Sequence, residues 1–449
     1  MNTPLRFLLA FVSGAIAVFA FPPFSWSLLV FVVWPLLFLA VRGAGFKTGV
    51  RLGVVHGLAL FVIALSWLWM PFHQLSIVLW FILALFPGLA CGLIGWSSKK
   101  HPLAWWLPLY VAAAWSGIEY FRSEWFYLRF PWMTPGMAVG PTWLSPVVGV
   151  YGVGFVVVLM AAFVVFGRTK WRLAGLPVLA LVMTPFPSPI YEAGQPVAVL
   201  AVQNENSDFS SYRSASESSG FRDGVILWPE YSAPFDMKPG HQEWDKVMEL
   251  ATDRNATVVF GSIKALPNEK HYNIARTMDA TGEVGWHAKN RPVHFMDDGV
   301  AGTETVPVVT KFGTLGTPIC FDCDYTEVVR RMVDAGAQAF VVPSMDVKTW
   351  SAREHLQHAE LFRLRAAETG RWFAVASSSG MTQFIDPRGH RVKALPLMDD
   401  GILRGSVYLR TDKTIFVCFG WMFPWLVLGS AVFATIALMT WRSEKPVVA

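Results

Sequence analysis

The sequence predicts a bundle of membrane-spanning α-helices joined to one α/β globular domain. The 449 residues are 53% hydrophobic and only 15% charged, whereas a soluble chain of this length usually carries more charge. Long apolar runs fill residues 1–186 and 415–441, while residues 187–414 have the composition of an ordinary globular domain. That middle segment is long enough to bury a core of its own. We therefore expect a helical bundle over 1–186, a globular domain over 187–414, and a final span with a cytoplasmic tail over 415–449.

About eight segments are candidates for membrane spans, because a span needs about 20 apolar residues. They are residues 5–21, 25–41, 50–70, 76–98, 103–118, 143–167, 171–185 and 415–441. Seven of these spans precede the globular domain. The first segment could also be a cleaved signal peptide, but the turn at Phe21-Pro22-Pro23-Phe24 leads directly into the second apolar run. That continuity favours an uncleaved helical hairpin.

The distribution of Lys and Arg predicts the orientation, because cytoplasmic loops carry an excess of both residues. With the N-terminus in the cytoplasm, eleven basic residues lie on the cytoplasmic side: Arg6, Arg42, Lys47, Arg51, Lys99, Lys100, Arg168, Lys170, Arg172, Arg442 and Lys445. Only Arg122 and Arg129 lie in the opposite short loops. The globular domain is then outside the cytoplasm. It has no basic stripe with interleaved aromatic residues, so nucleic acid is not an expected partner.

Strand and helix patterns alternate along residues 187–414. Strands are expected at residues 197–203, 225–228, 257–261, 314–319, 339–343 and 373–377, and helices at 243–252, 326–335 and 353–369. This alternation predicts an α/β layered fold. Seven of the 16 residues from Asn204 to Ser219 are Ser, which favours a loop over a helix there.

Two of the expected strands lead into residues with reactive side chains. The strand at 225–228 is followed by Glu230, and the strand at 314–319 is followed by Cys320. The carboxyl ends of strands are where α/β sheets place their sites. Taken alone, Glu230 is typical of a surface or capping residue, Cys320 of a small buried residue, and Lys289 of a solvated charge. Together they supply a nucleophile, a general base and a positive charge for an oxyanion, and this combination favours catalysis.

Three motifs resemble the Glu–Lys–Cys constellation of the nitrilase superfamily. They are Trp228-Pro229-Glu230, Lys289-Asn290-Arg291-Pro292-Val293 and Ile319-Cys320-Phe321-Asp322. Further motifs resemble the apolipoprotein N-acyltransferase family, and the likeness covers nearly the whole chain. These motifs are Ala20-Phe21-Pro22-Pro23-Phe24, Phe130-Pro131-Trp132, Val150-Tyr151-Gly152-Val153-Gly154-Phe155, His355-Leu356-Gln357-His358-Ala359 and Arg365-Ala366-Ala367-Glu368-Thr369-Gly370-Arg371.

The resemblance implies a fold and a reaction. The fold would be an αββα nitrilase-like domain on the periplasmic side of a bacterial inner membrane, in a multi-pass protein that we expect to be a monomer. A membrane phospholipid would give a fatty acyl chain to Cys320 as a thioester, and the N-terminal amine of a diacylglyceryl-cysteine lipoprotein would accept it in ping-pong order. Glu230 would be the general base. Lys289 would stabilise the oxyanion and lower the pKa of Cys320. No organic cofactor or metal is expected.

The resemblance also implies residues around the trio. The backbone N–H of Phe321 would help to bind the oxyanion, and Phe321 and Asp322 stand where the family has Tyr and Glu. Asp297 stands where a second functional glutamate is expected, with Asp298 as an adjacent competitor. The residues expected to contact substrate are Tyr212, Tyr231 and Trp350.

Several alternatives remain open from the sequence. The same trio could serve a membrane-tethered amidase or an acyltransferase with another acceptor, or the domain could be a non-enzymatic scaffold. Cys320 and Cys323 have the spacing of a redox pair, although no thioredoxin-like pattern surrounds them. His355 and His358 lie three residues apart on an expected helix and are interpreted as packing or hydrogen-bonding residues. Residues 119–142 could be a connecting loop or a re-entrant segment at a lipid entrance.

Overall fold

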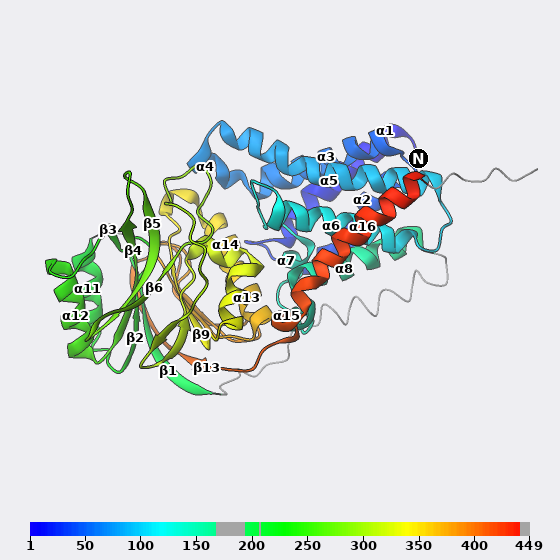
Figure 1. The fold of residues 1–449 in the computed structure, drawn as a ribbon. Coiled ribbons are helices and arrows are strands. Elements are labelled where there is room, and N and C mark those ends of the chain that lie inside the picture. The colour runs from blue at the N-terminus through cyan, green and yellow to red at the C-terminus, as the bar shows by residue number, and fades with distance from the viewer. Residues whose placement is uncertain (168–193, 206–207, 441–449) are drawn as a thin grey trace, which may run out of the picture. The chain divides into compact units, whose positions relative to one another are not determined.

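The computed structural model describes residues 1–167, 194–205 and 208–440. These residues form two compact units (Figure 1). One unit contains residues 1–139, 150–167 and 421–440, and it is helical. The other contains residues 140–149 and the described residues between 194 and 420, and it carries all the strands in the described part of the chain.

The helical unit contains several long apolar helices. Its α-helices, including one that begins in the other unit, are α1 (Thr3–Ala17), α2 (Val30–Val41), α3 (Phe46–Ala64), α4 (Trp69–Phe72), α5 (Leu75–Lys100), α6 (Leu107–Tyr120), α7 (Pro135–Val139), α8 (Ser145–Phe166) and α16 (Phe423–Thr440). Among the described residues, five segments are long and apolar enough to cross a membrane: Thr3–Ala20, Phe46–Ala64, Leu75–Lys100, Ser145–Phe166 and Gly420–Thr440.

Two of the expected spans form shorter helices, one lies outside the described residues, and one is interrupted. The segment expected at 25–41 forms the shorter apolar helix Ser27–Val41, and the one expected at 103–118 corresponds to α6, which has 14 residues. The span expected at 171–185 lies outside the described residues. The span expected at 143–167 is interrupted at Gly149, whose φ of 67° is not helical. Residues 119–142 contain a π-helical turn at Phe121–Trp125 and then α7.

Helices α3 and α5 pack through a row of small residues. A side chain at Gly49 or Gly53 would overlap the backbone of Cys91 or Pro87, and one at Gly57 would meet Ala84. Small residues let two helix backbones approach closely, which is the usual basis of helix association where the hydrophobic effect is weak.

The strand-containing unit is built from two sheets. The first has the order β13-β1-β2-β4-β5-β6, with β3 paired to β4, and the second has the order β12-β11-β10-β9-β8-β7. The strands of the first sheet are β1 (Gln195–Gln203), β2 (Gly224–Leu227), β3 (Ala233–Asp236), β4 (Thr257–Ala265), β5 (His271–Asp279), β6 (Gly282–Ala288) and β13 (Gly401–Leu409). Those of the second are β7 (Val308–Thr310), β8 (Gly313–Gly316), β9 (Ala339–Ser344), β10 (Phe373–Ser377), β11 (Gln383–Ile385) and β12 (Arg391–Ala394).

Helices cover the outer face of each sheet. Helices α11 (Phe209–Ser218) and α12 (Gln242–Arg254) lie outside the first sheet, and α13 (Thr326–Asp334) and α14 (Ala352–Thr369) outside the second (Figure 1). The short helix α15 (Ile415–Cys418) packs beside α13 and α14. The two sheets share a core of their own, to which both contribute apolar residues. The layers therefore run helix, sheet, sheet, helix, as the αββα expectation required.

The period of the strands explains these layers. In β1, Val197, Val199 and Ala201 enter the core between the sheets, whereas Leu200 and Val202 enter the core under α11 and α12. Successive side chains of a strand point to opposite faces, so a continuous apolar run is what a strand buried on both faces needs. The strands and helices expected from the sequence in this domain are confirmed, with ends that shift by up to four residues.

The expectation of a loop between Asn204 and Ser219 was wrong. Helix α11 begins after Asp208, whose side chain accepts a hydrogen bond from the backbone N–H of Ser210. Its buried residues Phe209, Tyr212 and Ser216 recur at the helical spacing. Each Ser costs a helix at most about 0.7 kcal/mol relative to Ala, and the buried face of α11 outweighs the cost of its Ser-rich surface.

Candidate active site

Glu230 lies just beyond the carboxyl end of β2, between the two sheets. Its backbone N–H donates to the carbonyl of Ser344, the last residue of β9, at 3.3 Å. The backbone of Gly261 in β4 lies directly against it, so that a side chain at Gly261 would overlap the Cα of Glu230. Only glycine therefore allows β4 to pass so close to the carboxylate-bearing residue.

Lys289 follows β6 and points into a buried polar group. Its Nζ lies 2.8 Å from Glu230 Oε1 and 2.8 Å from Asp298 Oδ2. Asn273 of β5 donates from its Nδ2 to both carboxylates, at 2.6 Å to Glu230 and 2.8 Å to Asp298. Tyr231 donates its hydroxyl to Asp298 Oδ1 at 3.1 Å. Glu230, Lys289, Asn273 and Asp298 are all buried, so they form one closed network.

The second carboxylate of this network is Asp298, and Asp297 is exposed. The expectation from the sequence placed Asp297 in this role, with Asp298 as its competitor. Phe295 lies in the turn at residues 294–295 and has a φ of 66°, and Asp298, three residues later, is buried. The backbone N–H of Val293 donates to Asp298 Oδ2 at 2.7 Å and fixes the returning loop on it.

One oxygen of Glu230 is left over by these contacts. Lys289 and Asn273 both donate to Oε1, while Oε2 is buried and has no hydrogen-bond partner among the described residues. A buried carboxylate oxygen without a donor is uncommon, and it asks for an explanation such as a catalytic role. An oxygen with this freedom can accept a proton from a bound reactant.

Cys320 opens a short turn, Cys320–Asp324, after β8. Its φ of 46° lies in the left-handed region, and such strain concentrates at functional sites in non-glycine residues. The thiol lies 3.8 Å from the carbonyl oxygen of Met345, and Cys320 packs with Ala275, Ile319 and Phe321. All four cysteines of the described chain are free, so Cys320 and Cys323 do not form a disulfide.

Asp322 ties the cysteine turn to the lysine loop. Its Oδ1 accepts from the backbone N–H groups of Asn290 and Arg291, at 2.9 and 2.8 Å. Its Oδ2 accepts from the N–H of Ile319 at 3.1 Å and lies 3.0 Å from His287 Nε2. Asp322 therefore holds the residues next to Lys289 and the residue before Cys320 in one place.

The charges of the group shift its pKa values. Burial raises the pKa of Glu230, although the Lys289 ammonium opposes this. Burial lowers the pKa of Lys289, but the carboxylates of Asp298 and Glu230 outweigh it and hold that pKa well above its ordinary value. Burial also raises the pKa of Asp298, but Lys289 and the hydrogen-bond donors around it bring the net value below normal. Lys289 pairs with both carboxylates at the same distance, and Glu230 is the more basic of the two.

The pKa of Cys320 is raised well above that of an ordinary thiol, first by burial and then by the Glu230 carboxylate. Lys289 lowers it, but not enough to reverse the sign. Lys289 thus acts on this pKa in the expected direction, but burial and Glu230 outweigh its effect. A thiol with a raised pKa would need a base to become reactive, and a carboxylate with a raised pKa, such as Glu230, suits that role.

The expected substrate-contacting residues lie in three different settings. Tyr231 belongs to the network through Asp298. Tyr212 is a core residue of α11, because its ring stacks on Trp228 at 5.9 Å and its hydroxyl donates to the carbonyl of Asn204 at 2.7 Å. Trp350 is half-buried in a short helix, Lys348–Trp350, and no hydrogen bond among the described residues joins it to the trio.

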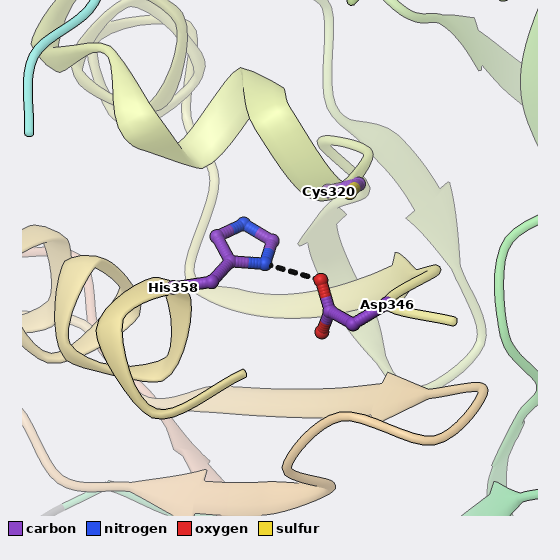
Figure 2. A group of neighbouring side chains, drawn as sticks. All are labelled: Cys320, Asp346 and His358. Atoms are coloured by element: carbon purple, nitrogen blue, oxygen red, sulfur yellow. Dashed lines mark hydrogen bonds and ion pairs between the residues drawn. The ribbon is translucent and has the colours of Figure 1, made fainter. Parts of the chain in front are cut away.

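Sequence reasoning missed Asn273. It stands inside the strand pattern of β5, where Asn is disfavoured, and this polar residue in a buried strand is the signal that could have found it. Asp346 was missed as well. It follows β9 and lies against His358 of α14 near Cys320 (Figure 2).

Comparisons with known proteins match both units. Residues 13–163 match the apolipoprotein N-acyltransferase N-terminal domain, and residues 214–411 match the carbon-nitrogen hydrolase family. An apolipoprotein N-acyltransferase from Pseudomonas aeruginosa (strain LESB58) is 28% identical over 466 residues, which covers 89% of each chain. The apolipoprotein N-acyltransferase of Pseudomonas syringae pv. tomato is 24% identical and covers 96% of this chain and 98% of its own. Among solved structures, Saccharomyces cerevisiae Nit3, a member of branch 10 of the nitrilase superfamily, is 21% identical, with a TM-score of 0.42 over 49% of this chain and 93% of its own.

The αββα fold and the hydrolase match define a membrane protein with a nitrilase-like catalytic domain. Within this class of membrane proteins, two findings point to one family. The helical unit matches a family model, and the relatives align along nearly the whole chain. The chain is similar along nearly its whole length to apolipoprotein N-acyltransferases, and its helical unit matches the N-terminal domain of that family.

Proposed function

We propose that this protein transfers a fatty acyl chain from a membrane phospholipid, through a thioester on Cys320, to the N-terminal amine of diacylglyceryl-cysteine lipoproteins. The observation that carries the proposal is the buried group of Glu230, Lys289, Asn273 and Asp298, in which the charges of Glu230 and Lys289 act on the Cys320 thiol. The names of the curated relatives support the choice of reaction.

In the first half-reaction Glu230 Oε2 takes the thiol proton as the sulfur attacks the ester carbonyl of the phospholipid. The oxyanion that forms would be stabilised by Lys289 Nζ and by the backbone N–H of Phe321, and donors of this kind are each worth about 2.7–4 kcal/mol of barrier. The carbon–oxygen bond then breaks. Glu230 returns its proton to the departing lysophospholipid alcohol, which leaves an acyl thioester and an ionised carboxylate.

In the second half-reaction the lipoprotein amine attacks the thioester carbonyl. Glu230 removes a proton from the attacking nitrogen, the carbon–sulfur bond breaks, and the proton returns to the sulfur. The free enzyme is regenerated with its original protons. The acyl chain stays on Cys320 as a thioester between the two half-reactions. The reaction therefore follows ping-pong order.

The proposed setting is a bacterial inner membrane, crossed by about eight spans, with the catalytic domain on the periplasmic side. The excess of Lys and Arg in the loops on one side of the spans supports this orientation. Both substrates are anchored in the membrane, so a catalytic domain tethered by spans before and after it would meet them at the lipid surface. We propose that the protein acts as a monomer.

The function is tested by supplying the purified protein with a defined phospholipid and a synthetic diacylated lipopeptide. We expect the lipopeptide to gain the mass of one acyl chain at its N-terminal amine, and the same peptide with an acetylated N-terminus to gain none. Hydrolysis of the phospholipid without acylation of the peptide would instead indicate an amidase or esterase, or another acceptor. Glu230→Gln should abolish the transfer, since the amide cannot accept the proton.

A further inference from the structure

A second set of polar side chains lies behind the nucleophile. Cys320, Asp346 and His358 each offer a potential ligand atom, and these atoms all lie within 4.8 Å of one another. They come from three separate elements, namely the turn after β8, the segment after β9, and α14 (Figure 2). All three residues are buried, so their convergence is not a chance gathering of surface groups.

The residues around this trio hold its side chains in place. His358 Nδ1 lies 2.7 Å from Asp346 Oδ1, and the other ring nitrogen, Nε2, lies 3.3 Å from Asp324 Oδ1. Asp346 Oδ2 accepts a hydrogen bond from Ser377 Oγ at 2.9 Å. A histidine that ligates a metal almost always has a carboxylate or carbonyl at its other ring nitrogen, and ligating carboxylates are themselves hydrogen-bonded. Asp324 and Ser377 occupy those supporting positions.

We propose that Cys320, Asp346 and His358 form a binding site for a divalent cation of the zinc type. Thiolate, imidazole and carboxylate are the three side chains that Zn²⁺ prefers. Three protein ligands leave a fourth position for water or another small ligand. The three ligand atoms lie within 4.8 Å of one another, so they need only a small inward movement to share one ion. Mg²⁺ and Ca²⁺, which prefer oxygen ligands, are not expected to bind.

The charge balance of this binding is favourable. The thiolate is the metal ligand, so binding releases the thiol proton of Cys320. The Cys320 thiolate and the Asp346 carboxylate then face the two positive charges of the cation, so that its charge is not buried without compensation.

Binding would block the nucleophile, because the sulfur lone pair that attacks the acyl donor would be shared with the metal. This consequence rests on the proposed function, in which Cys320 carries the acyl chain. The cation site itself does not rest on it. Zinc would then be a reversible inhibitor that competes with phospholipid and is removed by a chelator.

The test uses Cd²⁺ as a spectroscopic substitute for Zn²⁺ on the full-length protein in detergent micelles. We expect one Cd²⁺ per chain, with a sulfur-to-cadmium charge-transfer band in the ultraviolet that excess Zn²⁺ displaces and Mg²⁺ does not. The band should vanish in Cys320→Ala and remain in Cys323→Ala, which removes a thiol from the same turn. His358→Gln should weaken binding at least about 100-fold, and Asp324→Asn on the order of 10–100-fold, the usual effect of removing a supporting group.

His355→Gln is the matched control, because His355 lies one turn earlier on α14 and contacts the carbonyl of Val347 instead. It should keep the band at unchanged affinity. Thermal unfolding of each variant without metal separates loss of the site from loss of the fold. No band in the wild type at millimolar Cd²⁺, or a band that survives in folded His358→Gln or Cys320→Ala, would overturn the site. Metal binding without any acyl transfer would overturn the proposed function and leave the site standing.

Discussion

Lys289 Nζ and Asp298 Oδ2 form a buried ion pair at 2.8 Å, in which the aspartate comes from the loop that follows the lysine. Breaking a buried pair by removing one charge destabilises by about 3–5 kcal/mol. We therefore expect Asp298→Asn to lower the unfolding temperature and to slow thioester formation on the order of 10²-fold, because Lys289 is no longer held for the oxyanion. Rates of single-turnover acylation and thermal unfolding measure the two effects.

Asp297→Asn is the matched control for that substitution. Asp297 is the neighbouring residue and is exposed, so its acylation rate and stability should stay near those of the wild type. Equal losses in both variants would contradict the assignment of Asp298, and a larger loss at Asp297 would restore the expectation drawn from the sequence.

Asp322 accepts three backbone N–H groups and lies beside His287. Asp322→Asn replaces one carboxylate oxygen with an NH2 group, which cannot accept a hydrogen bond from these N–H donors. We therefore expect a large loss of both stability and acylation. Asp334→Asn provides the comparison, since its ion pair with Lys413 is exposed and such pairs contribute about 0–1 kcal/mol. Similar unfolding temperatures for the two variants would show that Asp322 does not hold the turn.

The raised pKa of Cys320 predicts a pH dependence. The thiolate reacts and the thiol does not, so alkylation at Cys320 should accelerate as the pH rises, with a midpoint above the ordinary thiol value of about 8.5. Lys289→Gln removes a neighbouring positive charge that lowers this pKa, and the midpoint should move further upward. Peptide mass spectrometry at a series of pH values separates Cys320 from Cys323, and a midpoint below the ordinary value would refute the burial argument.

Tyr212 tests whether α11 belongs to the core. Tyr212→Ala should destabilise the domain by about 3–5 kcal/mol through the cavity it leaves. Tyr212→Phe keeps the ring on Trp228 and loses only the hydrogen bond to Asn204, so a loss of about 1 kcal/mol is expected. Both variants should keep the wild-type KM for phospholipid in the folded fraction, whereas a rise in KM for Tyr212→Phe would restore a substrate-binding role.

The sequence was sufficient for the features that depend on local pattern. Strands buried on both faces, such as β1 and β9, appear as continuous apolar runs, and Glu230 and Cys320 lie shortly beyond the carboxyl ends of β2 and β8. Features that depend on tertiary contacts could not be predicted from local sequence patterns. Helix α11 was hidden by its Ser-rich surface, because only the buried positions of Phe209 and Tyr212 reveal its inner face.

Two details of the site depend on the loop geometry and on burial. Asp297 and Asp298 are adjacent in a stretch without periodicity, and they follow a turn in which Phe295 has a positive φ. The sign of the pKa shift at Cys320 depends on a balance between burial, Glu230 and Lys289. The spacing of residues along the sequence does not reveal which of these effects is larger.

The most direct measurement is the position of the acyl group itself. After incubation with a labelled phospholipid and rapid quenching, peptide mass spectrometry should find one hydroxylamine-sensitive acyl chain on Cys320. Cys323→Ala should retain that adduct and Cys320→Ala should lose it. An acyl chain on any other residue, or an adduct that persists in Cys320→Ala, would contradict the role of the Cys320 sulfur as the nucleophile.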